Sequence, residues 1–244
     1  MDNIYNNPEL YNAIHKNIDT DKKMITYYAK KCNGKTLELA AGTGRLARYI
    51  IDLGLPYTGI DISKVFIKEA KNAFQDKANF QFGNMQNFNH SISYDFIFIG
   101  FNSFLHNLTD QEARSCLNSV YQHLVRGGIF FISAYIPDPE FLYQGNELYP
   151  FTDHFNYKNK RCRIMGKNSY DEFTQINNIT WYVEYDGIIS KEKYNYNMRM
   201  YYPHMMDLLI NESGLIIEEK YGDWDNSPLD EYSPMQIYIC KKAD

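Results

Sequence analysis

A glycine-rich turn offers the clearest chemistry in the sequence. Residues 37–47, LELAAGTGRLA, predict a strand that runs through this turn into a helix. Gly42 and Gly44 lack a Cβ atom, so a ligand can approach the amide groups at the start of that helix. Asp61 follows nineteen residues after Gly42, at the end of the next predicted strand, where a carboxylate can accept hydrogen bonds from both ribose hydroxyls. Together these residues predict a site for a nucleotide-like ligand.

Glu38 helps to choose between two ligand classes, because Gly42-x-Gly44-x-x-Ala47 also satisfies the dinucleotide fingerprint. A carboxylate at the end of the first strand would not stabilise the negatively charged pyrophosphate of NAD. The same carboxylate would attract the positively charged ammonium and sulfonium groups of S-adenosylmethionine. The sequence therefore favours S-adenosylmethionine. An NAD-dependent oxidoreductase is the alternative function, and a structural pairing of Glu38 with Lys35 or Arg45 is the alternative role for this acid.

Further polar and apolar groups follow later strands at the same edge of the predicted sheet. Asn84 and Met85 come after the third strand and suit the edge and face of an adenine ring. Phe101, Asn102 and His106 come after the fourth strand. Helix capping is an equal alternative for Asn102, and packing is the alternative for His106. These residues are candidates for contact with the cofactor or the substrate.

The elements that must position these residues alternate as short apolar runs and amphipathic stretches, which is typical of βαβ units around a parallel sheet. Predicted strands span residues 36–40, 57–61, 79–82, 94–99 and 129–134, and predicted helices span 45–53, 64–74 and 110–124. Alternation over 161–199 predicts antiparallel strands with turns at 170–171 and 186–187. A helix at 203–213 and two strands at 215–221 and 235–241 complete the expected chain.

With these motifs in place, the sequence resembles the class I S-adenosylmethionine-dependent methyltransferases. The resemblance covers residues 35–134 and is carried by LELAAGTG, GIDIS, FGNM, YDFI and LVRGG, in that order. Further segments resemble a bacterial small-molecule branch related to glycine-type and amino-sugar N-methyltransferases: NPELY at 7–11, NSFLH at 102–106, MRMYYP at 198–203 and the loop at 222–234. Asn84 stands where the family often has Asp, which keeps a hydrogen-bond acceptor but removes a charge.

The resemblance implies an α/β fold with a doubly wound, seven-stranded, mostly parallel Rossmann-like sheet whose last strand is antiparallel. It implies a cofactor-binding domain at 1–136 and 203–244, and an antiparallel β insertion at 137–202 that roofs the acceptor site. The residues expected to bind the cofactor are Tyr11, Glu38, Ala40, Gly42, Gly44, Asp61, Ile62, Asn84, Met85 and Phe101. The expected catalytic residues are His106, Tyr11 and His204, and the expected substrate-binding residues are Asn102, His106, Arg199 and Tyr202.

Aromatic side chains concentrate in the expected insertion. Residues 137–202 hold 15 aromatics in 66 positions, where aromatic walls would suit an amine acceptor or its ammonium product. Core packing of a short-stranded sheet is the competing explanation. The distinction depends on whether Tyr194, Tyr196, Tyr201 and Tyr202 face a substrate or a core.

Composition bounds the remaining possibilities. The net charge of -5 gives no diffuse basic field for nucleic acid, and no apolar run is long enough to span a membrane. The four cysteines lack metal-ligand spacing and are expected to be reduced. We therefore expect a cytoplasmic monomer or homodimer, without a metal, that methylates a small molecule, with an amine nitrogen as the preferred acceptor atom. A non-catalytic S-adenosylmethionine sensor is a further alternative.

Overall fold

The computed structural model describes residues 3–145 and 147–242, which form two compact units. The larger unit comprises residues 19–136 and 201–242, and the smaller unit comprises 3–18 and 137–200. Residues 3–18 are thus grouped with residues 137–200 by their contacts. The expected division into a cofactor-binding domain and an acceptor-site insertion stays a prediction.

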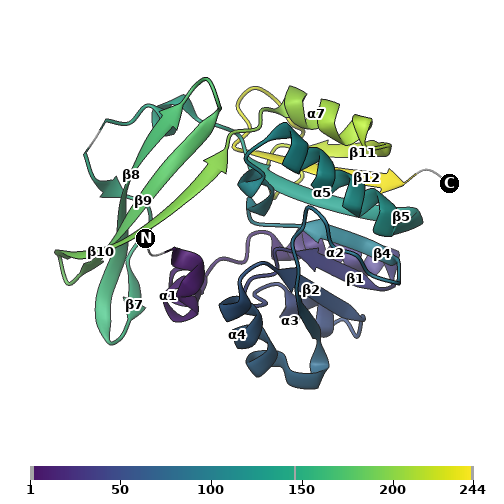
Figure 1. The fold of residues 1–244 in the computed structure, drawn as a ribbon, viewed down its shortest axis with the longest axis horizontal. Coiled ribbons are helices and arrows are strands. Elements are labelled where there is room, and N and C mark those ends of the chain that lie inside the picture. Colours follow the sequence, from purple (N-terminus) through teal and green to yellow (C-terminus); the bar gives the residue numbers. More distant parts are fainter. Residues whose placement is uncertain (1–2, 146, 243–244) are drawn as a thin grey trace. The chain divides into compact units, whose positions relative to one another are not determined.

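The larger unit is built on a seven-stranded sheet with the order β11-β12-β5-β4-β1-β2-β3 (Figure 1). Its strands are β1 (Thr36–Leu39), β2 (Tyr57–Asp61), β3 (Asn79–Phe82), β4 (Tyr94–Ile99), β5 (Leu124–Tyr135), β11 (Leu215–Tyr221) and β12 (Met235–Lys242). Strand β12 pairs antiparallel with both β5 and β11, and the other pairings are parallel. The predicted fold class is thereby confirmed, including the antiparallel last strand.

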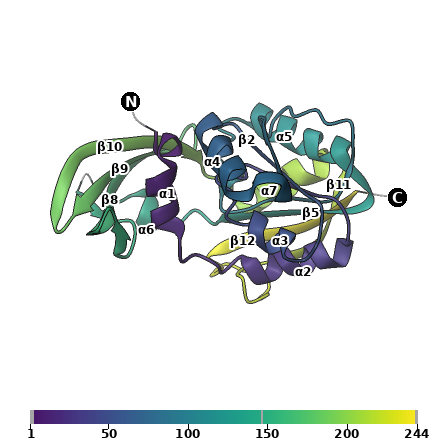
Figure 2. The same cartoon turned by 90° about the horizontal axis from the view of Figure 1, so that it is seen from below.

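Five α-helices surround this sheet: α2 (Lys22–Cys32), α3 (Ala47–Ile51), α4 (Lys64–Phe74), α5 (Asp110–His123) and α7 (Pro203–Glu212). Figure 2 shows α2 and α3 on one side of the sheet and α5 on the other. Helix α4 begins where expected, because the Ser63 side chain accepts a hydrogen bond from the Phe66 amide at 3.2 Å. Helix α3 is shorter than predicted, since residues 42–46 form turns.

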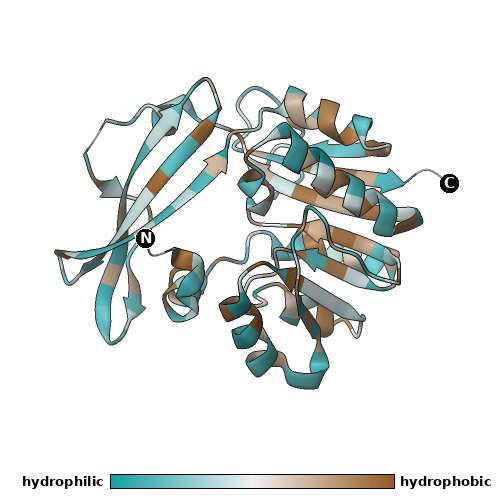
Figure 3. Cartoon of the chain, in the orientation of Figure 1, coloured by the Kyte–Doolittle hydropathy of each residue, from teal (hydrophilic) through white to brown (hydrophobic). Residues whose placement is uncertain are grey.

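The core of the larger unit lies where these helices meet the central strands. Phe96, Phe98 and Phe131 are fully buried there, with Ile237 and Ile239 of β12. Figure 3 shows hydrophobic residues along the central strands and mixed colours on the helices around them. Strands buried on both faces read as continuous apolar runs, which explains why they were predicted within a few residues. Among residues 3–145 and 147–242, no helix has the length and apolarity needed to cross a membrane.

The smaller unit is an antiparallel sheet with the order β10-β9-β8-β6, and β7 also pairs with β8. Its strands are β6 (Tyr149–Pro150), β7 (Phe155–Tyr157), β8 (Lys160–Asp171), β9 (Ile176–Tyr185) and β10 (Ile188–Arg199). The same unit contains the 3-10 helix η1 (Ile4–Asn6) and the helices α1 (Pro8–His15) and α6 (Pro139–Leu142).

One of the two predicted turns in the smaller unit moves along the chain. Asp186 and Gly187 connect β9 to β10 as predicted, both with positive φ, 49° and 86°. The turn expected at residues 170–171 lies instead at 172–175, because β8 continues through Asp171. The Oδ1 atom of Asp171 then accepts the Phe173 amide hydrogen at 2.9 Å and closes the turn.

Candidate cofactor site

The glycine-rich turn after β1 adopts a conformation that needs small residues. Ala40, Gly42 and Gly44 all have positive φ, at 56°, 58° and 87°. A Cβ atom on Gly44 would lie 2.6 Å from Phe74 and 2.9 Å from Phe80, so only glycine fits against these rings. The turn lies at the carboxyl end of β1, and its Ala41 and Gly44 amides donate to the carbonyl oxygens of Ile60 and Ala41 at 2.9 and 3.0 Å.

Asp61, the last residue of β2, is tied to this turn. Its Oδ2 atom accepts a hydrogen bond from the Gly42 amide at 2.8 Å, and its Oδ1 atom accepts one from the Ser63 amide at 2.7 Å. Burial raises the pKa of Asp61, and the two amide hydrogen bonds oppose this effect. A carboxylate has about four lone-pair positions, so both oxygens keep capacity for ribose hydroxyls.

Glu38 is a buried acid on β1, with 5% of its surface exposed. Its Oε2 atom accepts a hydrogen bond from the Tyr57 hydroxyl. Burial raises the pKa of Glu38 to about 8, while the Tyr57 hydrogen bond and the charge of Arg45 oppose this effect. Arg45 thus acts on Glu38 through its charge, while its bidentate hydrogen bonds go to Asp21.

Arg45 forms a bidentate ion pair with Asp21, a residue that the sequence analysis did not single out. Asp21 is 1% exposed, and the Nη1 atom of Arg45 lies 2.9 Å from its Oδ1 atom. The guanidinium also lies over the ring of Phe101, 4.6 Å from its centroid. The end of β4, the glycine-rich turn and the start of α2 are thereby linked. No sequence signal indicated this pairing, because Asp21 is one of several polar residues in its segment.

The turn after β3 is held by a network of amides. Asn84 accepts a hydrogen bond from the Gln86 backbone at 2.9 Å, and the Gln86 side chain donates to Asn107 at 3.2 Å. Asn107 is fully buried and approaches the Met85 sulfur at 4.0 Å. Gln86 and Asn107 were missed from the sequence because neither follows a strand directly. Ile62 is 65% exposed, which leaves its apolar side chain available to a ring.

Asn102 and His106 lie on the segment that follows β4. Asn102 has a φ of 63°, and its Oδ1 atom accepts the Tyr135 amide hydrogen at 2.8 Å. Within the described part of the chain its side chain makes no helix-cap bond, so it fixes the end of β5 rather than a helix. His106 is half-buried at the end of the 3-10 helix η3 (Ser103–His106).

The other predicted substrate and catalytic residues are divided between the two units. Tyr202 is half-buried at the N-cap of α7, and its ring stacks with that of exposed His204, with centroids 6.2 Å apart. These two residues belong to the larger unit. Tyr11 and Arg199 are half-buried in the smaller unit, where the Tyr11 ring lies 4.2 Å from that of His15.

Of the four tyrosines that could face either a substrate or a core, three are core residues. Tyr194 and Tyr196 are 7% and 8% exposed and pack in the apolar cluster of the smaller unit. Tyr201 is fully buried in the larger unit and donates a hydrogen bond to the Asn107 carbonyl at 2.7 Å. Only Tyr202 of the four is half-buried. Packing therefore accounts for most of this group, and the aromatic excess gives little support to an amine acceptor.

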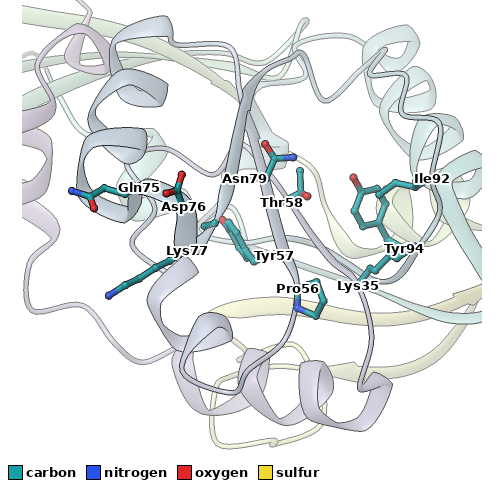
Figure 4. Close-up of a pocket in the computed structure, with 11 residues that line it drawn as sticks. Lys35, Pro56, Tyr57, Thr58, Gln75, Asp76, Lys77, Asn79, Ile92 and Tyr94 are labelled. Carbon is teal, nitrogen blue, oxygen red and sulfur yellow. The ribbon is translucent and has the colours of Figure 1, made fainter.

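The larger unit thus brings most of the predicted cofactor residues to one edge, at the carboxyl ends of β1 to β4. A separate pocket lies at the opposite edge of the same strands (Figure 4). It is lined by residues at the strand starts, including Lys35, Tyr57, Asn79 and Tyr94. Open parallel sheets bind ligands at the carboxyl ends of their strands, so the candidate cofactor site is the edge with the glycine-rich turn.

Comparison with known proteins agrees with this geometry. Residues 37–130 match the family model of a methyltransferase domain. No curated protein matches the chain. The solved CcbJ methyltransferase from Streptomyces caelestis superposes with a TM-score of 0.82 and 19% identity, over 99% of each chain.

An amino pentose methyltransferase, CalS10 from Micromonospora echinaspora, gives a TM-score of 0.75 and 12% identity over 96% of this chain and 97% of its own. The sugar N-methyltransferase KedS8 from Streptoalloteichus gives 0.75 and 11% over 96% and 92%. At these identities the structural likeness shows the fold. The family match and the fold together confirm the predicted resemblance to S-adenosylmethionine-dependent methyltransferases.

Proposed function

We propose that this chain is an S-adenosylmethionine-dependent methyltransferase that acts on a small molecule, with an amine nitrogen as the preferred acceptor atom. The observation that carries the proposal is the buried acid Glu38, which precedes a glycine-rich turn whose Gly42 amide donates a hydrogen bond to Asp61. An acid at this point favours a ligand with an ammonium group and a sulfonium. Among the solved neighbours, CalS10 binds S-adenosylmethionine, and the glycopeptide N-methyltransferase MtfA is complexed with sinefungin.

The residues present fit this cofactor. Gly42 and Gly44 have the positive φ that the turn requires, and the Asp61 carboxylate lies beside the turn, bound to the Gly42 amide. Asp61 would accept the ribose hydroxyls and Glu38 the ammonium group. S-adenosylmethionine, when bound, supplies a methyl group already activated by its sulfonium. The task left to the protein is to align a nucleophile about 3 to 3.5 Å from that carbon.

An amine acceptor must arrive unprotonated or lose its proton near the site. We retain His106, Tyr11 and His204 as candidate proton acceptors, and Asn102, His106, Arg199 and Tyr202 as candidate acceptor-binding residues. The choice of an amine rests on the solved neighbours rather than on the buried tyrosines. CalS10 is described as an amino pentose methyltransferase and KedS8 as a sugar N-methyltransferase.

Isothermal titration calorimetry with S-adenosylmethionine and with NAD tests the cofactor. We expect the first to bind and the second not to. Tight NAD binding without S-adenosylmethionine binding would instead support an oxidoreductase.

Transfer of a labelled methyl group to amino sugars, hydroxyl compounds and carboxylates tests the acceptor class. We expect transfer to the amines. Intact cofactor binding without transfer to any of the three classes would support a sensor.

A further inference from the structure

Tyr57 begins β2 at the edge opposite the glycine-rich turn, yet its hydroxyl reaches Glu38 on β1. Gly59 pairs with Glu38 in the register of β1 and β2 and leaves the path open. A Cβ atom on Gly59 would lie 2.9 Å from the Tyr57 hydroxyl oxygen and 2.8 Å from the Cβ atom of Ala41. Glycine at this position therefore allows the tyrosine to lie along the sheet, beneath the turn.

The tyrosine ring is held in this orientation by packing. Tyr57 is 5% exposed, and its ring centroid lies 5.5 Å from that of Phe80. Burial raises the pKa of the Tyr57 hydroxyl well above its usual value, and the nearby carboxyl of Glu38 raises it further. The hydroxyl therefore keeps its proton below pH 10 and is the donor in its bond to Glu38 whenever Glu38 is ionised.

We propose that Tyr57 is a positioning residue, whose hydroxyl fixes the carboxylate of Glu38 and favours its ionised form for the ammonium group of the cofactor. This inference rests on the proposed function, because it assumes that S-adenosylmethionine binds beside Glu38. The features of the site predicted from the sequence are the turn and its two acids. Tyr57 reaches this site from the other end of β2.

The charges around Glu38 explain why this hydroxyl matters. Burial disfavours the carboxylate, and the negative charges of Asp21 and Asp61 disfavour it further. The Tyr57 hydrogen bond and the positive charge of Arg45 favour it. The guanidinium of Arg45 is bound to Asp21, whereas the Tyr57 hydroxyl bonds Glu38 directly. Loss of this hydroxyl should therefore leave more of Glu38 protonated and unable to attract a cation.

The test is the Tyr57→Phe variant, which removes one oxygen and keeps the ring. We expect its dissociation constant for S-adenosylmethionine to rise about 3- to 10-fold at pH 7. The difference from the wild type should narrow towards pH 9.5, where Glu38 ionises in both proteins. The amino group of the ligand, with a pKa of about 8, also loses its charge over this range, so both titrations narrow the ratio of the two constants.

Tyr28→Phe is the matched control. The Tyr28 hydroxyl also donates to a carboxylate, that of Glu219 at 2.9 Å, in the same unit but on β11 at the far end of the sheet. This variant should bind the cofactor as the wild type does at every pH. A Tyr57→Phe variant that matches the wild type in affinity and in pH profile would overturn the inference.

A double-mutant cycle shows whether Tyr57 acts through Glu38. In a Glu38→Gln background, where no carboxylate can ionise, Tyr57→Phe should change the dissociation constant less than about 2-fold. An equal change in both backgrounds would mean that Tyr57 acts through packing, and the inference would fail.

Glu38→Asp tests the same bond if Tyr57→Phe does not fold. This change keeps the charge and draws the carboxylate back by about 1.5 Å, away from the hydroxyl. We expect it to weaken binding at pH 7, and wild-type affinity in this variant would contradict the inference. A wild-type protein that does not bind S-adenosylmethionine at all would instead refute the proposed function, and the inference with it.

Discussion

The carboxylate of Asp61 accepts a hydrogen bond from the Gly42 amide at 2.8 Å, which joins the end of β2 to the turn after β1. The same side chain accepts the Ser63 amide hydrogen at 2.7 Å, just before α4 begins. The residue predicted to hold the ribose thus also shapes the loop beside it. Ligand binding and local structure should therefore respond together when Asp61 is changed.

Asp61→Ala should weaken S-adenosylmethionine binding by about 1 to 3 kcal/mol, because charge-assisted hydrogen bonds to the ribose and to the turn are lost. Calorimetry measures the affinity, and circular dichroism checks that the fold is kept. Asp95→Ala is the control, since Asp95 also accepts a backbone amide hydrogen, that of Lys35 at 2.7 Å, but at the opposite edge of the sheet. Unchanged affinity in Asp61→Ala would place the ribose elsewhere.

Gly44→Ala should destabilise the larger unit by about 2 to 4 kcal/mol. The new methyl group adds an unfavourable left-handed conformation and a collision with Phe74 and Phe80. Gly54→Ala separates these two costs, because Gly54 has a similar φ of 74° but nothing within 4 Å of the added atom. It should lose only about 1 kcal/mol. Urea denaturation measures the free energy of unfolding of both variants. Equal losses would mean that the Phe74 and Phe80 rings move aside to accommodate the methyl group.

Asp21→Asn should reduce the free energy of unfolding by about 3 kcal/mol, because it leaves the charge of Arg45 without its partner in a largely buried position. Glu218→Gln is the matched surface case. Glu218 and Lys241 are 31% and 36% exposed, so that change should cost less than about 1 kcal/mol. Similar losses in the two variants would mean that the Asp21 pair is effectively solvated.

Glu38→Gln should become more stable relative to the wild type as pH rises from about 5 to about 8. The pKa of Glu38 is raised from 4.5 to about 8 in the folded protein, so its neutral form stabilises the fold below pH 4.5 and this advantage is lost through pH 8. Glutamine is neutral at every pH and avoids the loss. Urea denaturation of both proteins at several pH values measures the difference, and parallel pH profiles would contradict a buried neutral acid.

The elements around the candidate cofactor site could be predicted from local sequence pattern. Residues 36–134 alternate apolar strands with amphipathic helices, and the glycine-rich turn and Asp61 follow their strands directly, so local pattern places them. Parallel strands end at a common edge, which is why Glu38, Asp61 and Met85 could be assigned to one edge without coordinates. The family match over residues 37–130 lies in the same stretch.

The hydrogen-bond partners of the buried polar groups could not be predicted from the sequence. The Tyr57 bond to Glu38 and the Arg45 pair with Asp21 join residues 19 and 24 positions apart, on different elements. Whether a tyrosine such as Tyr194 packs in a core or faces solvent is likewise set by what covers its strand. Periodicity records which side of a strand is apolar, but partners are chosen by distance and direction in space, and those exist only after the sheet has formed.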